Sequence, residues 1–109
     1  MSGAVPSLSI EELKQKRDRG ERFTLLDVRE PHEWSISDLP GSKKIPLGSL
    51  PQRFEELSKE DDIFVYCRTG GRSAQAVQFL LANGYAKARN LVGGINRWAE
   101  AVDPTMRKY

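Results

Sequence analysis

The stretch that decides the fold is residues 63–73, which read Ile63-Phe64-Val65-Tyr66-Cys67-Arg68-Thr69-Gly70-Gly71-Arg72-Ser73. Its first four residues are apolar and mostly β-favouring, which predicts a buried strand. Two glycines then allow a sharp turn, and a helical pattern follows with Ser73 as its expected N-cap. The one cysteine of the chain therefore lies where a strand turns into a helix.

A turn of this kind directs several backbone N–H groups inward, toward the side chain of Cys67. Together with the N-terminus of the following helix, these donors stabilise a thiolate, so we expect a pKa below the ordinary ~8.5. Burial works against ionisation, and we expect electrostatics to prevail because the loop tip has to be open to a substrate. The alternative is an inert buried cysteine, which is common for this residue type. The flanking arginines favour the reactive interpretation.

Outward from this stretch, strands alternate with helices. We expect further strands over residues 23–28, 43–47 and 88–92, with 43–47 near a sheet edge. We expect helices over residues 10–17, around Trp34, from Ser49 onward, over 73–83 and over 95–102. The alternation predicts an α/β fold, a parallel sheet between two layers of helices. At 109 residues, we expect one domain over residues 8–109 preceded by a tail or linker over residues 1–7.

The composition indicates a soluble globular protein, with 39% apolar and 29% charged residues. No apolar run approaches the ~20 residues that span a bilayer, and the N-terminus lacks the pattern of a secretory signal. A cytoplasmic location is therefore the expected one. One cysteine and one histidine, His32, exclude an internal disulfide and do not make a zinc site.

The net charge of +2 conceals an asymmetry along the chain. Residues 1–62 hold 13 acids and 10 bases, whereas residues 63–109 hold 2 acids and 7 bases. Cys67 therefore lies within a basic segment, which favours an anionic substrate or an acidic protein partner. Alternatively, the bases beyond the loop are merely solvated surface. Nucleic acid is a weaker interpretation, because the bases are not interleaved with aromatic residues.

Four segments resemble the rhodanese family. Residues 26–34 resemble its Asp-Val-Arg segment, and residues 67–72 its six-residue active-site loop. Residues 39–42 resemble its His-Ile-Pro-Gly-Ala element, with Asp38 where histidine is common, and residues 90–98 its closing Gly-Gly element. The resemblance implies a three-layer α/β/α sandwich around a five-stranded parallel sheet.

The resemblance also implies a function, that of a sulfurtransferase. Cys67 would carry sulfane sulfur as a persulfide, from thiosulfate or another persulfide donor to a thiol, cyanide or a sulfur-carrier protein. No metal or organic cofactor is implied. The implied substrate-binding residues are Arg68, Thr69, Gly70, Gly71, Arg72 and Ser73. Asp27 and Arg29 are candidate supporting residues at the carboxyl edge of the sheet. For Asp27 we favour a structural cap or salt bridge.

Three alternatives remain. Related cysteine phosphatases and arsenate reductases have one more residue between cysteine and arginine, and a tetrahedral oxyanion needs that wider ring of amides. Four intervening residues here favour sulfur. A cysteine hydrolase with His32 as its base is not required by the spacing. A non-catalytic docking module is the third, and the intact Cys67 argues against it.

The closing residues 101–109 resemble the end of one group of rhodanese domains. Those domains follow adenylyltransferases that activate small sulfur-carrier proteins in molybdopterin synthesis, thiamine synthesis or tRNA thiolation. The resemblance implies a fused adenylyltransferase domain or a small ubiquitin-like carrier as partner, beside a small anionic sulfur donor. We expect neither a nucleic acid nor a membrane as partner.

Overall fold

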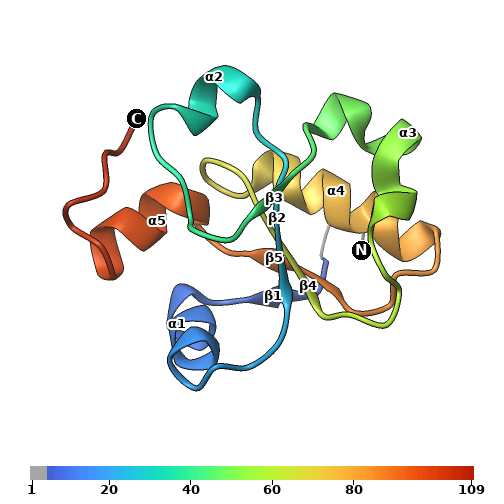
Figure 1. The fold of residues 1–109 in the computed structure, drawn as a ribbon, viewed down its shortest axis with the longest axis horizontal. Coiled ribbons are helices and arrows are strands. Elements are labelled where there is room, and N and C mark those ends of the chain that lie inside the picture. The colour runs from blue at the N-terminus through green and yellow to red at the C-terminus, as the bar shows by residue number, and fades with distance from the viewer. Residues whose placement is uncertain (1–4) are drawn as a thin grey trace.

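The computed structural model describes residues 5–109 and is built around one parallel sheet (Figure 1). Its strand order is β1-β5-β4-β2-β3. The strands are β1 (Ser7–Leu8), β2 (Thr24–Asp27), β3 (Lys43–Lys44), β4 (Ile63–Tyr66) and β5 (Ala88–Leu91). The helices are α1 (Ile10–Asp18), α2 (Pro31–Trp34), α3 (Leu50–Arg53), α4 (Gly71–Ala82) and α5 (Gly94–Ala101). Short 3₁₀ turns at Leu47–Ser49 and Phe54–Glu56 flank α3.

The central strand β4 is buried on both faces. Ile63 and Val65 pack into a core with residues of α3 and α4, whereas Phe64 and Tyr66 pack into a second core with residues of α1 and α5. Side chains of a strand alternate between faces, so one strand of four apolar residues supplies both cores. Figure 1 shows α3 and α4 on one side of the sheet and α1 on the other. The predicted parallel three-layer α/β fold is confirmed.

The N-terminal strand is not visible in the sequence pattern. The expected tail over residues 1–7 is shorter in the structure, because Ser7 begins β1 and pairs with Asn90 of β5. Val5 also packs against the first core. Residues 1–4 of the expected tail lie outside the described residues. A strand of two residues is too short to show alternation, so only its pairing with β5 reveals it.

The helix after the cysteine loop begins earlier than predicted. Gly70 is its N-cap with φ +119°, a left-handed conformation that favours glycine, and α4 starts at Gly71. The expected N-cap role of Ser73 is therefore wrong, since Ser73 already lies within the first turn. Ser49 likewise makes no side-chain capping bond, and the helix expected after it is the short α3. Within the described residues, no helix is both long and apolar enough to cross a membrane.

Candidate active site

Cys67 directly follows β4 at the carboxyl end of the sheet, and hydrogen-bond donors surround its sulfur. The N–H of Gly70 donates to Cys67 Sγ at 3.1 Å. The backbone N–H groups of Thr69 and Ser73 also lower the pKa of the thiol, and Ser73 Oγ lies 3.4 Å from the sulfur. The amide of Gly70 therefore faces the sulfur as predicted, and the hydroxyl of Ser73 lies beside it.

Burial and hydrogen bonding act on the Cys67 thiol in opposite directions. Burial raises its pKa, whereas the hydroxyl of Ser73 and the N–H groups of Ser73, Gly70 and Thr69 lower it. The net pKa lies below the ordinary value, in the predicted direction. The side chain of Cys67 itself is only 1% exposed. Arg68 and Thr69 form the exposed part of the loop, while the cysteine lies at its base.

Strand β5 supports the loop from the neighbouring position in the sheet. The buried Ser73 Oγ contacts the side-chain oxygen of Asn90, and Asn90 Nδ2 donates to the carbonyl of Gly70 at 3.2 Å. Asn90 was not among the expected site residues. Asn90 belongs to the Gly-Gly element of residues 90–98, but its orientation toward the loop depends on the parallel pairing of β4 with β5.

The N-terminus of α5 packs directly against the loop backbone. The N–H of Ile95 donates to the carbonyl of Cys67 at 2.9 Å. Gly94 has φ +62°, and a Cβ atom there would lie 2.4 Å from the carbonyl oxygen of Arg68. No real Cβ contact is that short, so only glycine allows this approach. Close packing of α5 against the loop therefore requires glycine at this position of the Gly-Gly element.

The two arginines of the loop have different surroundings. Arg72 makes a bidentate ion pair with Glu33 of α2, at 2.7 and 2.8 Å. The Arg72 guanidinium, together with other hydrogen bonds, holds the pKa of Glu33 well below its usual range, although burial opposes this shift. Arg68 is exposed, and its guanidinium lies 5.0 Å from the centre of the Tyr109 ring. Glu33 and Tyr109 were not predicted as site residues.

Asp27 and Arg29 form a buried ion pair at the end of β2. Both side chains are fully buried, and Arg29 Nη2 lies 2.8 Å from Asp27 Oδ2. The structural interpretation of Asp27 is confirmed, since its partner is Arg29 rather than an arginine of the loop. The pair reaches the loop indirectly: Arg29 bonds Tyr109, which bonds Glu33, the partner of Arg72.

Three other bases of the C-terminal half contact neighbouring parts of the domain. Lys87 Nζ donates to the carbonyl of Glu60, and the guanidinium of Arg89 donates to the carbonyl of Ser7. Arg97 lies 3.7 Å from Glu11. These contacts agree with the solvated-surface interpretation, and they leave Arg68 and Arg72 as the bases that belong to the loop.

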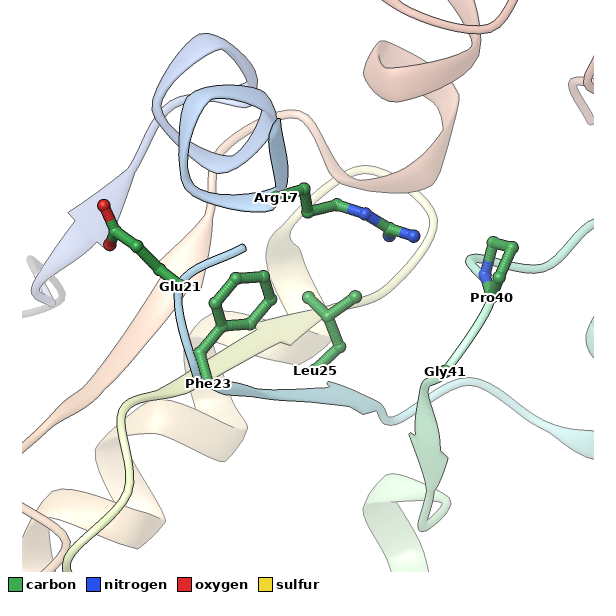
Figure 2. Close-up of a pocket in the computed structure, with 6 residues that line it drawn as sticks. All are labelled: Arg17, Glu21, Phe23, Leu25, Pro40 and Gly41. Atoms are coloured by element: carbon green, nitrogen blue, oxygen red, sulfur yellow. The ribbon is translucent and has the colours of Figure 1, made fainter. Parts of the chain in front are cut away.

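A hollow of about 260 Å³ lies elsewhere on the molecule (Figure 2). The residues that line it are Arg17, Glu21, Phe23, Leu25, Pro40 and Gly41. Figure 2 shows Arg17 reaching from α1 toward Pro40, across Leu25. None of these residues belongs to the loop from Cys67 to Ser73, so the candidate site is defined by hydrogen-bonding geometry and not by this hollow.

The Ser73 hydroxyl should set the acidity of the thiol. We expect Ser73→Ala to raise the pKa of Cys67, because the Ser73 hydroxyl lowers that pKa and the substitution removes it. Alkylation by iodoacetamide, followed against pH, should then reach its midpoint at higher pH and be slower at neutral pH. Thr69→Ala is the matched control, since Thr69 contributes through its backbone. An unchanged midpoint in Ser73→Ala would contradict this assignment.

The chain is similar to known sulfur-transfer proteins. The family model "Rhodanese-like domain" matches residues 9–101. A "Sulfurtransferase" of Allochromatium vinosum is 37% identical over 95 residues, which cover 87% of this chain and 89% of that protein. The "Adenylyltransferase and sulfurtransferase MOCS3" of Arabidopsis thaliana is 34% identical over 97% of this chain, but over only 26% of its own length.

Solved structures agree with these relatives. The human single-domain sulfurtransferase TSTD1 superposes with a TM-score of 0.78 at 30% identity, covering 90% of this chain and 98% of that one. With a family model over residues 9–101, the cysteine loop at its expected place and a common fold, the chain belongs to the family of rhodanese-like domains.

Proposed function

We propose that the protein is a sulfurtransferase that carries sulfane sulfur on Cys67. The observation that carries this proposal is the ring of polar groups around one sulfur atom: the Gly70 N–H donates to it, the Ser73 hydroxyl lies 3.4 Å from it, and the amides of Thr69 and Ser73 also lower the pKa of the thiol. Such a ring stabilises a thiolate and, after reaction, a persulfide anion. The relatives named as sulfurtransferases support the same role.

The reaction would proceed in two steps. The Cys67 thiolate attacks the outer sulfur of thiosulfate, an S–S bond to Cys67 forms, and the S–S bond of thiosulfate breaks to release sulfite. Cys67 then holds a persulfide anion, and one negative charge has been kept on the protein throughout. In the second step a thiolate or cyanide attacks the outer sulfur and leaves with it, which regenerates the Cys67 thiolate.

The loop residues would bind the donor during the first step. Arg68 is exposed and Arg72 about one-third exposed beside the loop, so both can attract the anionic donor and the departing sulfite. Thr69, Gly70, Gly71 and Ser73 would contribute their backbone N–H groups or the Ser73 hydroxyl. Because the cysteine itself carries the transferred atom, the chemistry requires no metal or organic cofactor.

The physiological acceptor would be a sulfur-carrier protein. Relatives whose names combine adenylyltransferase and sulfurtransferase support a fused or separate adenylyltransferase as partner. The chain spans 52% of the length of a Bacillus subtilis protein named as a putative sulfur carrier and 26% of the Arabidopsis protein. The reducing cytoplasm would keep Cys67 free for this chemistry.

Mass spectrometry after treatment with thiosulfate tests the proposal. We expect the protein to gain the mass of one sulfur atom, and cyanide or a reductant to remove it. Release of phosphate from an aryl phosphate without that adduct would instead support a phosphatase. Absence of both reactions, with native folding confirmed, would support a non-catalytic docking module.

A further inference from the structure

Tyr109 lies against the charged groups that surround the cysteine loop. Its ring centre is 5.0 Å from the guanidinium carbon of Arg68. Its hydroxyl accepts a hydrogen bond from Arg29 at 3.0 Å and donates one to Glu33 at 2.7 Å. Figure 1 shows the C-terminal end of the described chain beside α2, the helix that carries Glu33. One side chain therefore contacts groups from two distant parts of the sequence, residues 29–33 and the cysteine loop.

The Tyr109 hydroxyl joins two ion pairs into one chain of hydrogen bonds. On one side Arg29 is bound to Asp27, and on the other Glu33 is bound to Arg72. A hydroxyl can accept from a cation and donate to a carboxylate at once, so it satisfies both without adding charge. Burial raises the pKa of Tyr109, which keeps the hydroxyl protonated at neutral pH.

The contacts of Tyr109 lead to both arginines of the loop, Arg68 and Arg72. The ring of Tyr109 supports the guanidinium of Arg68 by a cation–π contact. Its hydroxyl holds Glu33 Oε1, and Glu33 in turn holds both terminal nitrogens of Arg72. The backbone adds a further link, since the N–H of Tyr109 donates to the side chain of Asn96 and the N–H of Asn96 donates to the carbonyl of Arg68.

We propose that Tyr109 is a positioning residue for the donor site, placing the guanidinium groups of Arg68 and Arg72 where an anionic sulfur donor meets Cys67. This inference rests on the proposed sulfurtransferase function. Tyr109 touches neither the sulfur nor the donor and acts through the two arginines. Its loss should therefore weaken capture of the anion and leave the reactivity of the persulfide unchanged.

Two substitutions separate the roles of the ring and the hydroxyl. Tyr109→Phe removes the hydrogen bonds but keeps the ring over Arg68, and Tyr109→Leu removes both. We expect kcat/KM for thiosulfate to fall about three- to tenfold in Tyr109→Phe and further in Tyr109→Leu, as the loss of a typical hydrogen bond implies. The rate at which cyanide discharges preformed persulfide should stay within about twofold of the unmodified protein.

Tyr85→Phe is the matched control. The Tyr85 hydroxyl is also buried and donates to the carbonyls of Phe54 and Leu57, away from the loop. Its removal should lower the unfolding midpoint without changing kcat/KM for thiosulfate. If Tyr109→Phe behaves as Tyr85→Phe does, or slows both half-reactions equally, Tyr109 is merely structural and the proposal is wrong.

A second readout does not require turnover. Sulfate, an unreactive analogue of thiosulfate, should protect Cys67 from iodoacetamide by occupying the site beside Arg68 and Arg72. Tyr109→Phe should raise the protecting sulfate concentration by the same factor as it lowers kcat/KM. If no persulfide forms but this shift is found, the proposed function fails while Tyr109 keeps its positioning role. An unchanged protecting concentration overturns the role of Tyr109.

Discussion

Thiocyanate formation from thiosulfate and cyanide is expected to fall to background when Cys67 is replaced by serine. The reaction stores sulfur in an S–S bond, and a serine hydroxyl neither ionises near neutral pH nor forms a stable equivalent of that bond. We expect a loss of at least about a thousandfold, the scale on which removal of a nucleophile acts. The steady-state assay at saturating thiosulfate and cyanide measures it directly.

The Cys67→Ser variant should keep its fold, which makes the result interpretable. Serine is slightly smaller than cysteine, and its oxygen can accept the N–H of Gly70 that the sulfur now accepts. An unfolding midpoint close to that of the unmodified protein is the required control. Turnover that persists in a folded Cys67→Ser variant would remove Cys67 from the mechanism, and with it the persulfide pathway.

Replacement of Arg29 by methionine should strongly destabilise the fold. The side chain of Arg29 is fully buried and donates to Asp27, to the carbonyls of Glu33 and Ser37, and to Tyr109. Methionine fills similar volume but leaves the buried Asp27 carboxylate without its cation. Breaking a buried pair in this way costs about 3–5 kcal/mol, which urea denaturation should show as a lower free energy of unfolding.

A double variant distinguishes the lost pair from lost packing. In Asp27→Asn/Arg29→Met no uncompensated charge remains, so the double variant should lose less stability than the two single variants added together. Arg53→Met is the control for removing an arginine from an ion pair, because Arg53 pairs with Glu56 on the exposed surface and should contribute little. If Arg29→Met costs less than about 1 kcal/mol, the pair does not support the carboxyl edge of the sheet as we argue.

Much of the fold of this protein can be predicted from local sequence patterns. The apolar run Ile63–Tyr66 and its following glycines predict a buried strand, a tight turn and a helix in that order, and all three are present. Such features depend on neighbours within a few residues, so a pattern in the chain is sufficient to reveal them. The same holds for Asp27 and Arg29, which lie two residues apart and pair with each other.

The lowered pKa of the Cys67 thiol also depends on residues close to it in the sequence. Gly70, Thr69 and Ser73 follow Cys67 within six residues, and their backbone N–H groups lower the pKa of the thiol. The direction of the pKa shift was therefore predictable. The degree of burial was not, because α5 and β5 close over the base of the loop from more than twenty residues away.

The surroundings of the two arginines were decided by the tertiary structure alone. Glu33 precedes Arg72 by 39 residues and Tyr109 follows Glu33 by 76. Nothing in the spacing of these residues indicates that they meet; only the parallel order of the strands brings α2, the loop and the C-terminal stretch to one edge of the sheet. Sequence thus determined which residue can carry sulfur, and long-range packing determined which groups hold the charges around it.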